Sequence, residues 1–211
     1  MVAEMAQIFL ANAENIPASE QEHADYLTIL VTRARGGDAL AFERILLATE
    51  KRVVSIAWRM LGNRDDARDA TQEVYLRVYK YLGRFRAGED FRGWLYRITI
   101  NVCHDIARRN RSSATRLTEL DVAELPIVEG STANPEQAVL HQQQLAMVRT
   151  ALQMLSRKER AALVLRDLEG LSTEEVARIL GSRPVTVRSQ VSSARAKIKN
   201  YCEKLSGRRS V

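Results

Sequence analysis

The sequence predicts an all-α protein made of two small helical domains joined by a flexible linker, with a helix-turn-helix in the C-terminal domain. Apolar residues recur at helical spacing from Tyr26 to Asn110 and again from Ala138 to Leu205. No stretch combines strict apolar–polar alternation with hairpin signals, so strands are not expected. Between the two periodic segments Ser, Thr, Pro, Gly and Glu replace the apolar residues, as expected of a linker that buries too little surface to order itself.

These changes of composition divide the 211 residues into four segments. We expect residues 1–23 to be a loosely ordered extension, residues 24–111 the first domain, residues 112–137 the linker and residues 138–211 the second domain. The N-terminal stretch lacks the basic start and the longer apolar core of a signal peptide, and no apolar run approaches membrane-spanning length. The sequence therefore predicts a cytoplasmic protein that does not insert into a membrane.

Charge and cysteine content narrow the functional classes. Lys and Arg number 32 against 26 Asp and Glu, and a net charge of +6 favours a polyanionic partner. Cys103 and Cys202 show no paired spacing, so neither a disulfide framework nor a metal site is indicated. No cofactor is expected.

The segment that begins at Arg64 has two different sides when it is drawn as a helix. One side is apolar and consists of Ala70, Val74, Val78 and Tyr81. The other side, which we call the docking stripe, consists of Asp69, Gln72, Glu73 and Leu76. Such a stripe suits a protein-docking surface, because the leucine supplies buried area and the carboxylates supply orientation. A charged face that meets only solvent is the alternative, and the pattern alone does not decide between them.

The segment FRGWLYRITINVCHDIARRNR, from Phe91 to Arg111, is apolar and cationic at once. Its predicted buried face consists of Leu95, Ile98, Val102 and Ile106. Another face, which we call the single-strand track, consists of Arg97, Asn101, His104 and Arg108, with Trp94 at its border. Basic side chains, an amide and aromatic rings suit unpaired nucleotides, whose nucleobases stack on aromatic rings and form hydrogen bonds with Asn. Tyr96 lies off both faces near the preceding loop, and Trp94 and Tyr96 as plain core aromatics are the alternative.

Two pairs in the second domain have the spacing of a capping box, in which a serine and a glutamate satisfy free N–H groups at a helix start. The pairs are Ser156 with Glu159 and Ser172 with Glu175. Leu171 and Val176 occupy the positions of a hydrophobic staple. Gly181 can close the second helix in the left-handed conformation, and Pro184 is tolerated in the first turn of the next. A short helix, a tight turn and a longer basic helix form the helix-turn-helix pattern.

The last helix of that pattern also has two faces. Val187, Val191, Ala194 and Ile198 follow the spacing of a buried face, whereas Arg188, Ser192, Arg195 and Lys199 share another. Polar and cationic side chains in this arrangement suit the major groove of duplex DNA. There Arg contacts guanine edges, and the other basic side chains contact phosphates. A solvated basic face is the alternative; the caps and the turn that precede the stripe favour DNA.

In this order the segments resemble a bacterial sigma factor of the extracytoplasmic-function group, in the sigma-70 family. The likeness runs from Tyr26 to Leu205 and is carried by DARDATQEVYLRVYKYL, FRGWLYRITINVCHDIARRNR and, after the linker, LSRKERAALVLRDLEGLSTEEVARIL with TVRSQ. It implies a transcription initiation factor without catalysis of its own, which binds core RNA polymerase and directs promoter-specific initiation. The implied partners are core RNA polymerase, promoter DNA and an anti-sigma factor.

The resemblance also assigns roles to residues. The docking stripe matches the surface that binds the polymerase clamp, and the linker matches a segment that enters the polymerase channel. The set matched to the melted minus-ten element is Arg84, Phe85, Arg86, Trp94, Tyr96, Arg97, Asn101, His104 and Arg108. The set matched to the minus-thirty-five element is Arg183, Thr186, Arg188, Ser189, Ser192, Arg195 and Lys199.

The second domain departs from the family pattern at several positions. Gln190 replaces a usual Arg, and Ser192 and Ser193 stand where relatives often carry an aromatic or His followed by Arg. Pro184 comes one place later than the common proline, and Val185 replaces a usual small residue. These departures leave the exact base contacts open.

Two other functions share parts of the pattern. A helix-turn-helix DNA-binding regulator that does not bind core polymerase would share the second domain, but it has no use for both the docking stripe and the single-strand track. A sigma-like decoy that binds an inhibitor and no promoter is compatible with Ser192 and Ser193. The presence of Tyr96, Asn101 and Arg188 argues against the decoy.

An enzyme is not expected. The sequence contains no glycine-rich phosphate loop, nucleophile elbow or cluster of metal ligands. Asp65, Asp66 and Asp69 resemble the acids of a metal-dependent nuclease only superficially, because acids near a helix start are favoured by the helix dipole.

Overall fold

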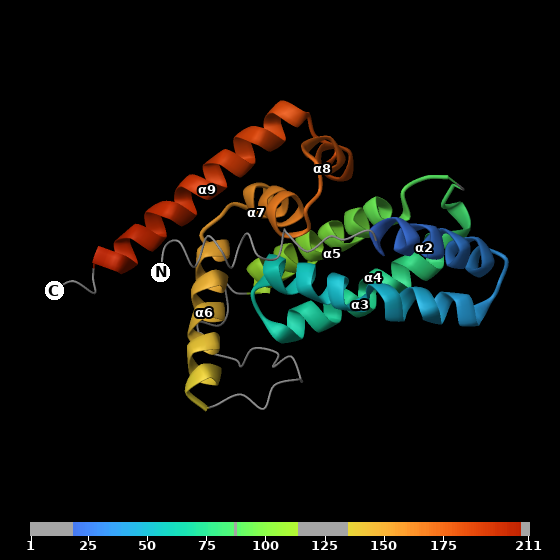
Figure 1. The fold of residues 1–211 in the computed structure, drawn as a ribbon, viewed down its shortest axis with the longest axis horizontal. Coiled ribbons are helices and arrows are strands. Elements are labelled where there is room, and N and C mark those ends of the chain that lie inside the picture. The colour runs from blue at the N-terminus through green and yellow to red at the C-terminus, as the bar shows by residue number, and fades with distance from the viewer. Residues whose placement is uncertain (1–18, 87, 114–134, 208–211) are drawn as a thin grey trace.

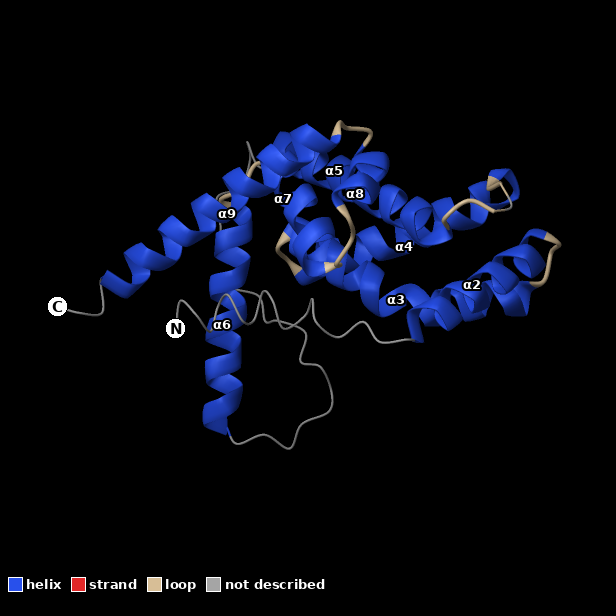
Figure 2. Ribbon diagram, turned by 45° about the horizontal axis from the view of Figure 1, so that its top comes forward, coloured by secondary structure: helices blue, strands red, loops and turns tan. Residues whose placement is uncertain are grey.

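The computed structural model describes residues 19–86, 88–113 and 135–207 of the chain, and every regular element within these ranges is a helix (Figures 1 and 2). The all-α prediction is therefore confirmed. Most of the predicted N-terminal extension and linker, residues 1–23 and 112–137, lies outside the described residues. Helix α2 begins at Ser19 and α6 at Pro135, so each starts a few residues before the predicted boundary.

The first helical unit corresponds to the first predicted domain. It comprises α2 (Ser19–Arg35), α3 (Ala39–Leu61), α4 (Arg64–Tyr81), the short 3-10 helix η1 (Leu82–Arg84) and α5 (Phe91–Ser113). Asp38 and Asn63 cap α3 and α4 with side-chain oxygens, as expected of these residue types at a helix start. Helices α3, α4 and α5 pack on one another, and α2 packs on α3.

The second helical unit contains the helix-turn-helix. It comprises α6 (Pro135–Gln153), α7 (Arg157–Leu163), the π-helical turn η2 (Val164–Leu168), α8 (Thr173–Leu180) and α9 (Pro184–Gly207). Both predicted capping boxes form, and the staple residues Leu171 and Val176 are buried. Gly181 ends α8 in the left-handed conformation at φ +59°, and α9 begins at Pro184 as predicted.

The two units pack directly against each other, which the sequence did not predict. Helix α8 lies against α5, and α3 meets α6, α7 and η2 (Figure 1). One continuous cluster of buried side chains runs through both units, from Leu30 in α2 to Ala194 in α9. Cys103 and Cys202 are both buried thiols that form no disulfide. In the part of the chain that the structure describes, no helix has the combined length and hydropathy needed to cross a membrane.

Candidate nucleic-acid and protein interfaces

The docking stripe lies on the outer surface of α4. Ala70, Val74 and Val78 are buried in the core, while Asp69, Gln72 and Leu76 are exposed on the opposite side. Leu76 exposes 65% of its surface. The predicted apolar side of this helix was wrong at one position, because Tyr81 at the end of α4 is exposed.

Glu73 is the one member of the docking stripe that has a close partner among the described residues. Its carboxylate accepts a hydrogen bond of 2.7 Å from Arg77, and Arg77 also pairs with Asp105 of α5 at 3.2 Å. Glu73 thus belongs to a short ion-pair chain that joins α4 to α5. The neighbouring Asp69 is the more open of the two carboxylates.

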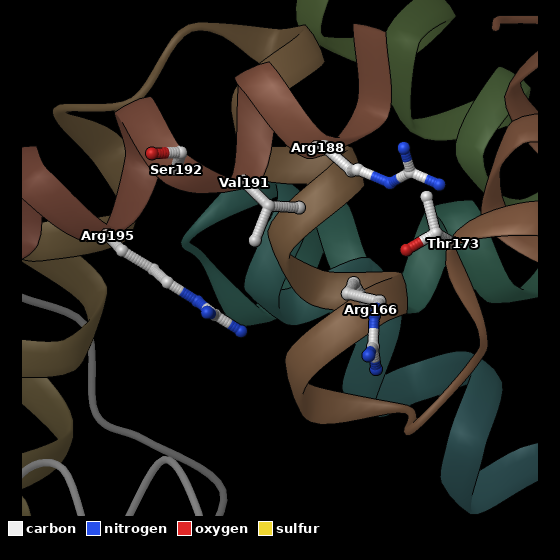
Figure 3. A pocket seen from close by; sticks show the side chains of 6 residues that line it. All are labelled: Arg166, Thr173, Arg188, Val191, Ser192 and Arg195. Carbon is white, nitrogen blue, oxygen red and sulfur yellow. The ribbon is translucent and has the colours of Figure 1, made fainter. Parts of the chain in front are cut away.

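The side of α9 that the sequence assigned to DNA is exposed. All seven residues matched to the minus-thirty-five element are exposed, while Val187, Val191 and Ala194 of the same helix are buried. Arg188, Val191, Ser192 and Arg195 line a hollow together with Arg166 from η2 and Thr173 from α8 (Figure 3). No sequence pattern indicated Arg166, because it precedes α8 and lies outside both helices of the motif.

Two arginines on this side of α9 are held by carboxylates of the same unit. Arg195 donates two hydrogen bonds to Asp167, at 2.6 and 2.8 Å, and Arg188 lies 3.5 Å from Glu174. Asp167 is the less exposed partner in its pair, with 16% of its side-chain surface accessible against 62% for Arg195. A groove phosphate would therefore compete with a carboxylate for Arg195.

Ser193 has a structural role in this arrangement. Its hydroxyl donates to the Glu159 carboxylate at 2.6 Å, and Lys197 donates to both oxygens of that carboxylate at 2.8 Å. These bonds from Lys197 and Ser193 lower the pKa of Glu159 to about 2. Ser193 therefore ties α9 to the start of α7, which accounts for a short polar side chain at a position where relatives often carry Arg.

Three members of the single-strand track and two arginines before it are exposed. Arg97, Asn101 and Arg108 lie on α5, and Arg84 and Arg86 precede the helix. Arg108 pairs with Asp105 at 3.0 Å, and the guanidinium of Arg84 lies 5.7 Å from the ring centroid of Tyr81.

The aromatic residues near the loop form a cluster of their own. Phe85 is buried and packs on Phe91 and Trp94, with ring centroids 5.6 and 5.2 Å away. Trp94 is half-buried in the same cluster. The ring of Phe85 is thus part of the core, and only the edge of the cluster at Trp94 meets solvent.

Tyr96, Arg97 and His104 are engaged by the second unit. Tyr96 is 1% exposed, and its hydroxyl lies 3.4 Å from the Glu169 carboxylate. Arg97 donates to the backbone oxygen of Arg178 in α8 at 2.7 Å. The two units therefore meet over part of the surface that the sequence assigned to single-stranded DNA. Tyr96 is buried in this arrangement, whereas Arg97 stays exposed although its guanidinium is bonded to α8.

Burial alters the acid–base properties of the contact. Burial raises the pKa of Tyr96 to about 12 and, as the leading cause, also raises the pKa of Glu169. Burial lowers the pKa of His104, and the positive charge of Arg157 in α7 lowers it further. Arg59 of α3 pairs with Glu169 at 2.8 Å. The sequence offered no signal for either residue, since contacts between distant segments leave no local pattern.

Two family models and several known proteins match the chain. Residues 46–113 match the Sigma-70 region 2 model, and residues 145–198 match the Sigma-70, region 4 model. The RNA polymerase sigma-H factor of Pseudomonas aeruginosa is 35% identical over 176 residues, which cover 80% of this chain and 90% of that protein. The ECF RNA polymerase sigma-E factor of Escherichia coli is 32% identical over 181 residues, or 84% and 94% of the two chains.

A solved structure has the same fold. The sigma factor RpoE from Bartonella quintana, determined in complex with the anti-sigma factor NepR, superposes with a TM-score of 0.62 at 25% identity. The match covers 77% of this chain and 96% of that one.

Proposed function

This chain belongs to the extracytoplasmic-function sigma factors of the sigma-70 family, and we propose that its two helical units divide promoter recognition between them. As a sigma factor it is not an enzyme; it directs RNA polymerase to promoters. The first unit, residues 24–111, would dock on core polymerase and hold the melted minus-ten element. The second, residues 138–211, would bind the minus-thirty-five element, and the linker between them would enter the polymerase channel.

Core polymerase binding is assigned to the docking stripe. The supporting observation is that Asp69, Gln72 and Leu76 are exposed together on α4, although Ala70, Val74 and Val78 on the opposite side are buried. An exposed leucine beside carboxylates supplies both contact area and a charge pattern that orients a partner.

Duplex recognition is assigned to α9. The observation that carries the proposal best is that all seven candidate residues are exposed, six of them on α9 and Arg183 in the turn before it, while the other face of α9 anchors it in the core. Arg188 and Ser189 near its start would contact base edges, and Arg195 and Lys199 further along would contact phosphates. Arg166 in η2 lines the same hollow and is a further candidate for a phosphate contact.

Capture of the melted strand is assigned to the loop and α5. Asn101, Arg84, Arg86 and Arg108 are open, and they would hold bases and phosphates of an unpaired strand. Tyr96 and Arg97 would join them once the second unit moves away from α5.

A cytoplasmic location and an anti-sigma partner complete the proposal. The cytoplasmic location is expected because members of this family act together with RNA polymerase. The partner is supported by the RpoE structure, which was determined with an anti-sigma factor bound.

In-vitro transcription tests the proposed function. The purified full chain would be added to sigma-free core polymerase on a pool of genomic promoter fragments, and transcript starts would be mapped by sequencing. We expect core-dependent starts that share paired upstream elements. Asn101→Ala should reduce open complexes while sparing duplex binding, whereas Arg188→Ala should alter preference at the upstream element. Duplex binding without core-dependent starts would instead indicate a DNA-binding regulator.

A further inference from the structure

A carboxylate of the second unit is inserted into a cationic pocket of the first. Glu169 follows η2, and its Oε1 lies 2.8 Å from Nη1 of Arg59 in α3. Its Oε2 lies 3.4 Å from the Tyr96 hydroxyl of α5, which in turn is 3.5 Å from Nη1 of Arg52. Both partners of the ion pair are withdrawn from solvent, with 17% of the Arg59 and 7% of the Glu169 side chain exposed.

Three arginines of the first unit act on Glu169. Arg52, Arg59 and Arg92 all stabilise its charged form. Burial of a carboxylate is costly, and burial of the Arg59 guanidinium beside it adds to the cost. A cluster of this composition suits an anion with several acceptor oxygens better than it suits one carboxylate.

The pocket is built without help from the second unit. Arg52 and Arg59 stand on α3, Arg92 and Tyr96 on α5, and these two helices pack directly on each other. Separation of the units would withdraw Glu169 and leave the donors in place, facing solvent. The next turn of α5 carries Arg97, which the second unit also engages, and then the exposed Asn101.

We propose that Arg52, Arg59, Arg92 and Tyr96 form an anion site for a backbone phosphate of the melted promoter strand, and that Glu169 fills this site while the two units are packed together. A phosphodiester offers two oxygens that accept from guanidinium groups and from the tyrosine hydroxyl. Glu169 is then an internal substitute for DNA, so closure of the units and capture of the strand exclude each other. The inference rests on the proposed function of α5 in strand capture.

The test measures binding of a fluorescein-labelled, random-sequence single-stranded DNA of about 20 nucleotides to the full chain by anisotropy. Glu169→Gln keeps the size of the side chain and removes its charge. We expect it to tighten binding about fivefold or more, at the low end of coupling between sites. Glu43→Gln, an exposed site on α3, removes the same charge elsewhere and should leave the affinity within about twofold.

Two further variants test the pocket itself. Tyr96→Phe keeps the ring and removes only the hydroxyl, and Arg59→Gln removes one guanidinium; each, combined with Glu169→Gln, should cancel most of the gain. Thermal unfolding of each variant shows whether it is folded. If the Arg59→Gln variant does not fold, the Tyr96→Phe variant alone tests the pocket. A peptide nucleic acid of random sequence, which lacks phosphates, should bind the Glu169→Gln and unchanged chains equally.

The outcomes are distinct. If Glu169→Gln leaves single-strand affinity unchanged, or if the gain survives both pocket substitutions, the anion site is wrong. An equal gain with the peptide nucleic acid would also overturn it, because the contact would then be with bases. Transcription from promoters by the unchanged chain is independent of these results, so loss of the anion site would leave the proposed function standing.

Discussion

Single carboxylates hold polar and basic side chains of α9 in place. Asp167 holds Arg195 beside the exposed hollow with two short hydrogen bonds, and Glu159 is held by Ser193 and Lys197 on the side that faces α7. The two serines that depart from the family pattern thus differ in kind. Ser192 is exposed and lines the hollow, whereas Ser193 is a structural contact.

At this scale we predict that Asp167→Asn tightens binding to duplex DNA. The substitution releases the guanidinium of Arg195 from an exposed ion pair, so an affinity gain of about two- to fivefold is expected. The logarithm of affinity should also depend more steeply on the logarithm of salt concentration, because one more phosphate contact forms. Gel-shift titration at several salt concentrations measures both quantities, with Glu43→Gln as the control for net charge. A looser complex would mean that Asp167 orients Arg195 toward DNA.

The helices themselves follow from local chemistry. Both capping boxes, Gly181 at the end of α8 and Pro184 at the start of α9 could be predicted, because each depends on neighbouring residues alone. The faces of α4 and α9 could be predicted for the same reason. Tyr81 shows the limit of this reasoning, since a residue in the last turn of a helix extends past the core that the periodic pattern assumes.

The stripe on α4 leads to a prediction for that helix as a unit. Asp69→Ala combined with Leu76→Ala should weaken binding to core polymerase about tenfold or more, because the pair removes both a charge and the main apolar contact. The melting temperature should stay nearly unchanged, since both side chains are exposed. Pull-down with core polymerase measures the loss of binding, and a thermal melt measures the melting temperature. Glu73→Ala is a poorer probe, because it also disturbs the Arg77 link to Asp105.

At the scale of the whole molecule, the packing of the two units is the feature that sequence reasoning missed. The linker composition predicted a tether, and helical periodicity accounts equally well for a face buried within a unit or between units. Tyr96 illustrates the difficulty: it lies off both faces of α5 by periodicity, yet it is fully buried through contacts with residues more than seventy positions away. Arg59 and Glu169 pair across a still longer stretch of chain.

This packing should depend on pH through His104. The pKa of His104 is lowered below its ordinary value of 6.5 by burial and by the nearby Arg157 and Arg160 of the second unit. A neutral His104 therefore favours the packed arrangement above about pH 6.5, and that contribution is lost as the pH falls below this value. Energy transfer between dyes on Glu43→Cys and Lys204→Cys should decrease between pH 7.5 and 5.5. Adding His104→Gln should flatten that response, and an unchanged response would place the titration elsewhere.

The contact between Arg59 and Glu169 also limits how freely the two units can be exchanged among relatives. Helix-turn-helix units look like interchangeable modules, and a chimera that joins this first unit to another protein's second unit would be expected to acquire only a new upstream promoter element. Here the graft would also replace the residue that fills the pocket on α3 and α5. Such a chimera would differ from its parent in the balance between its packed and separated forms as well as in its promoter preference, unless position 169 is carried over with the graft.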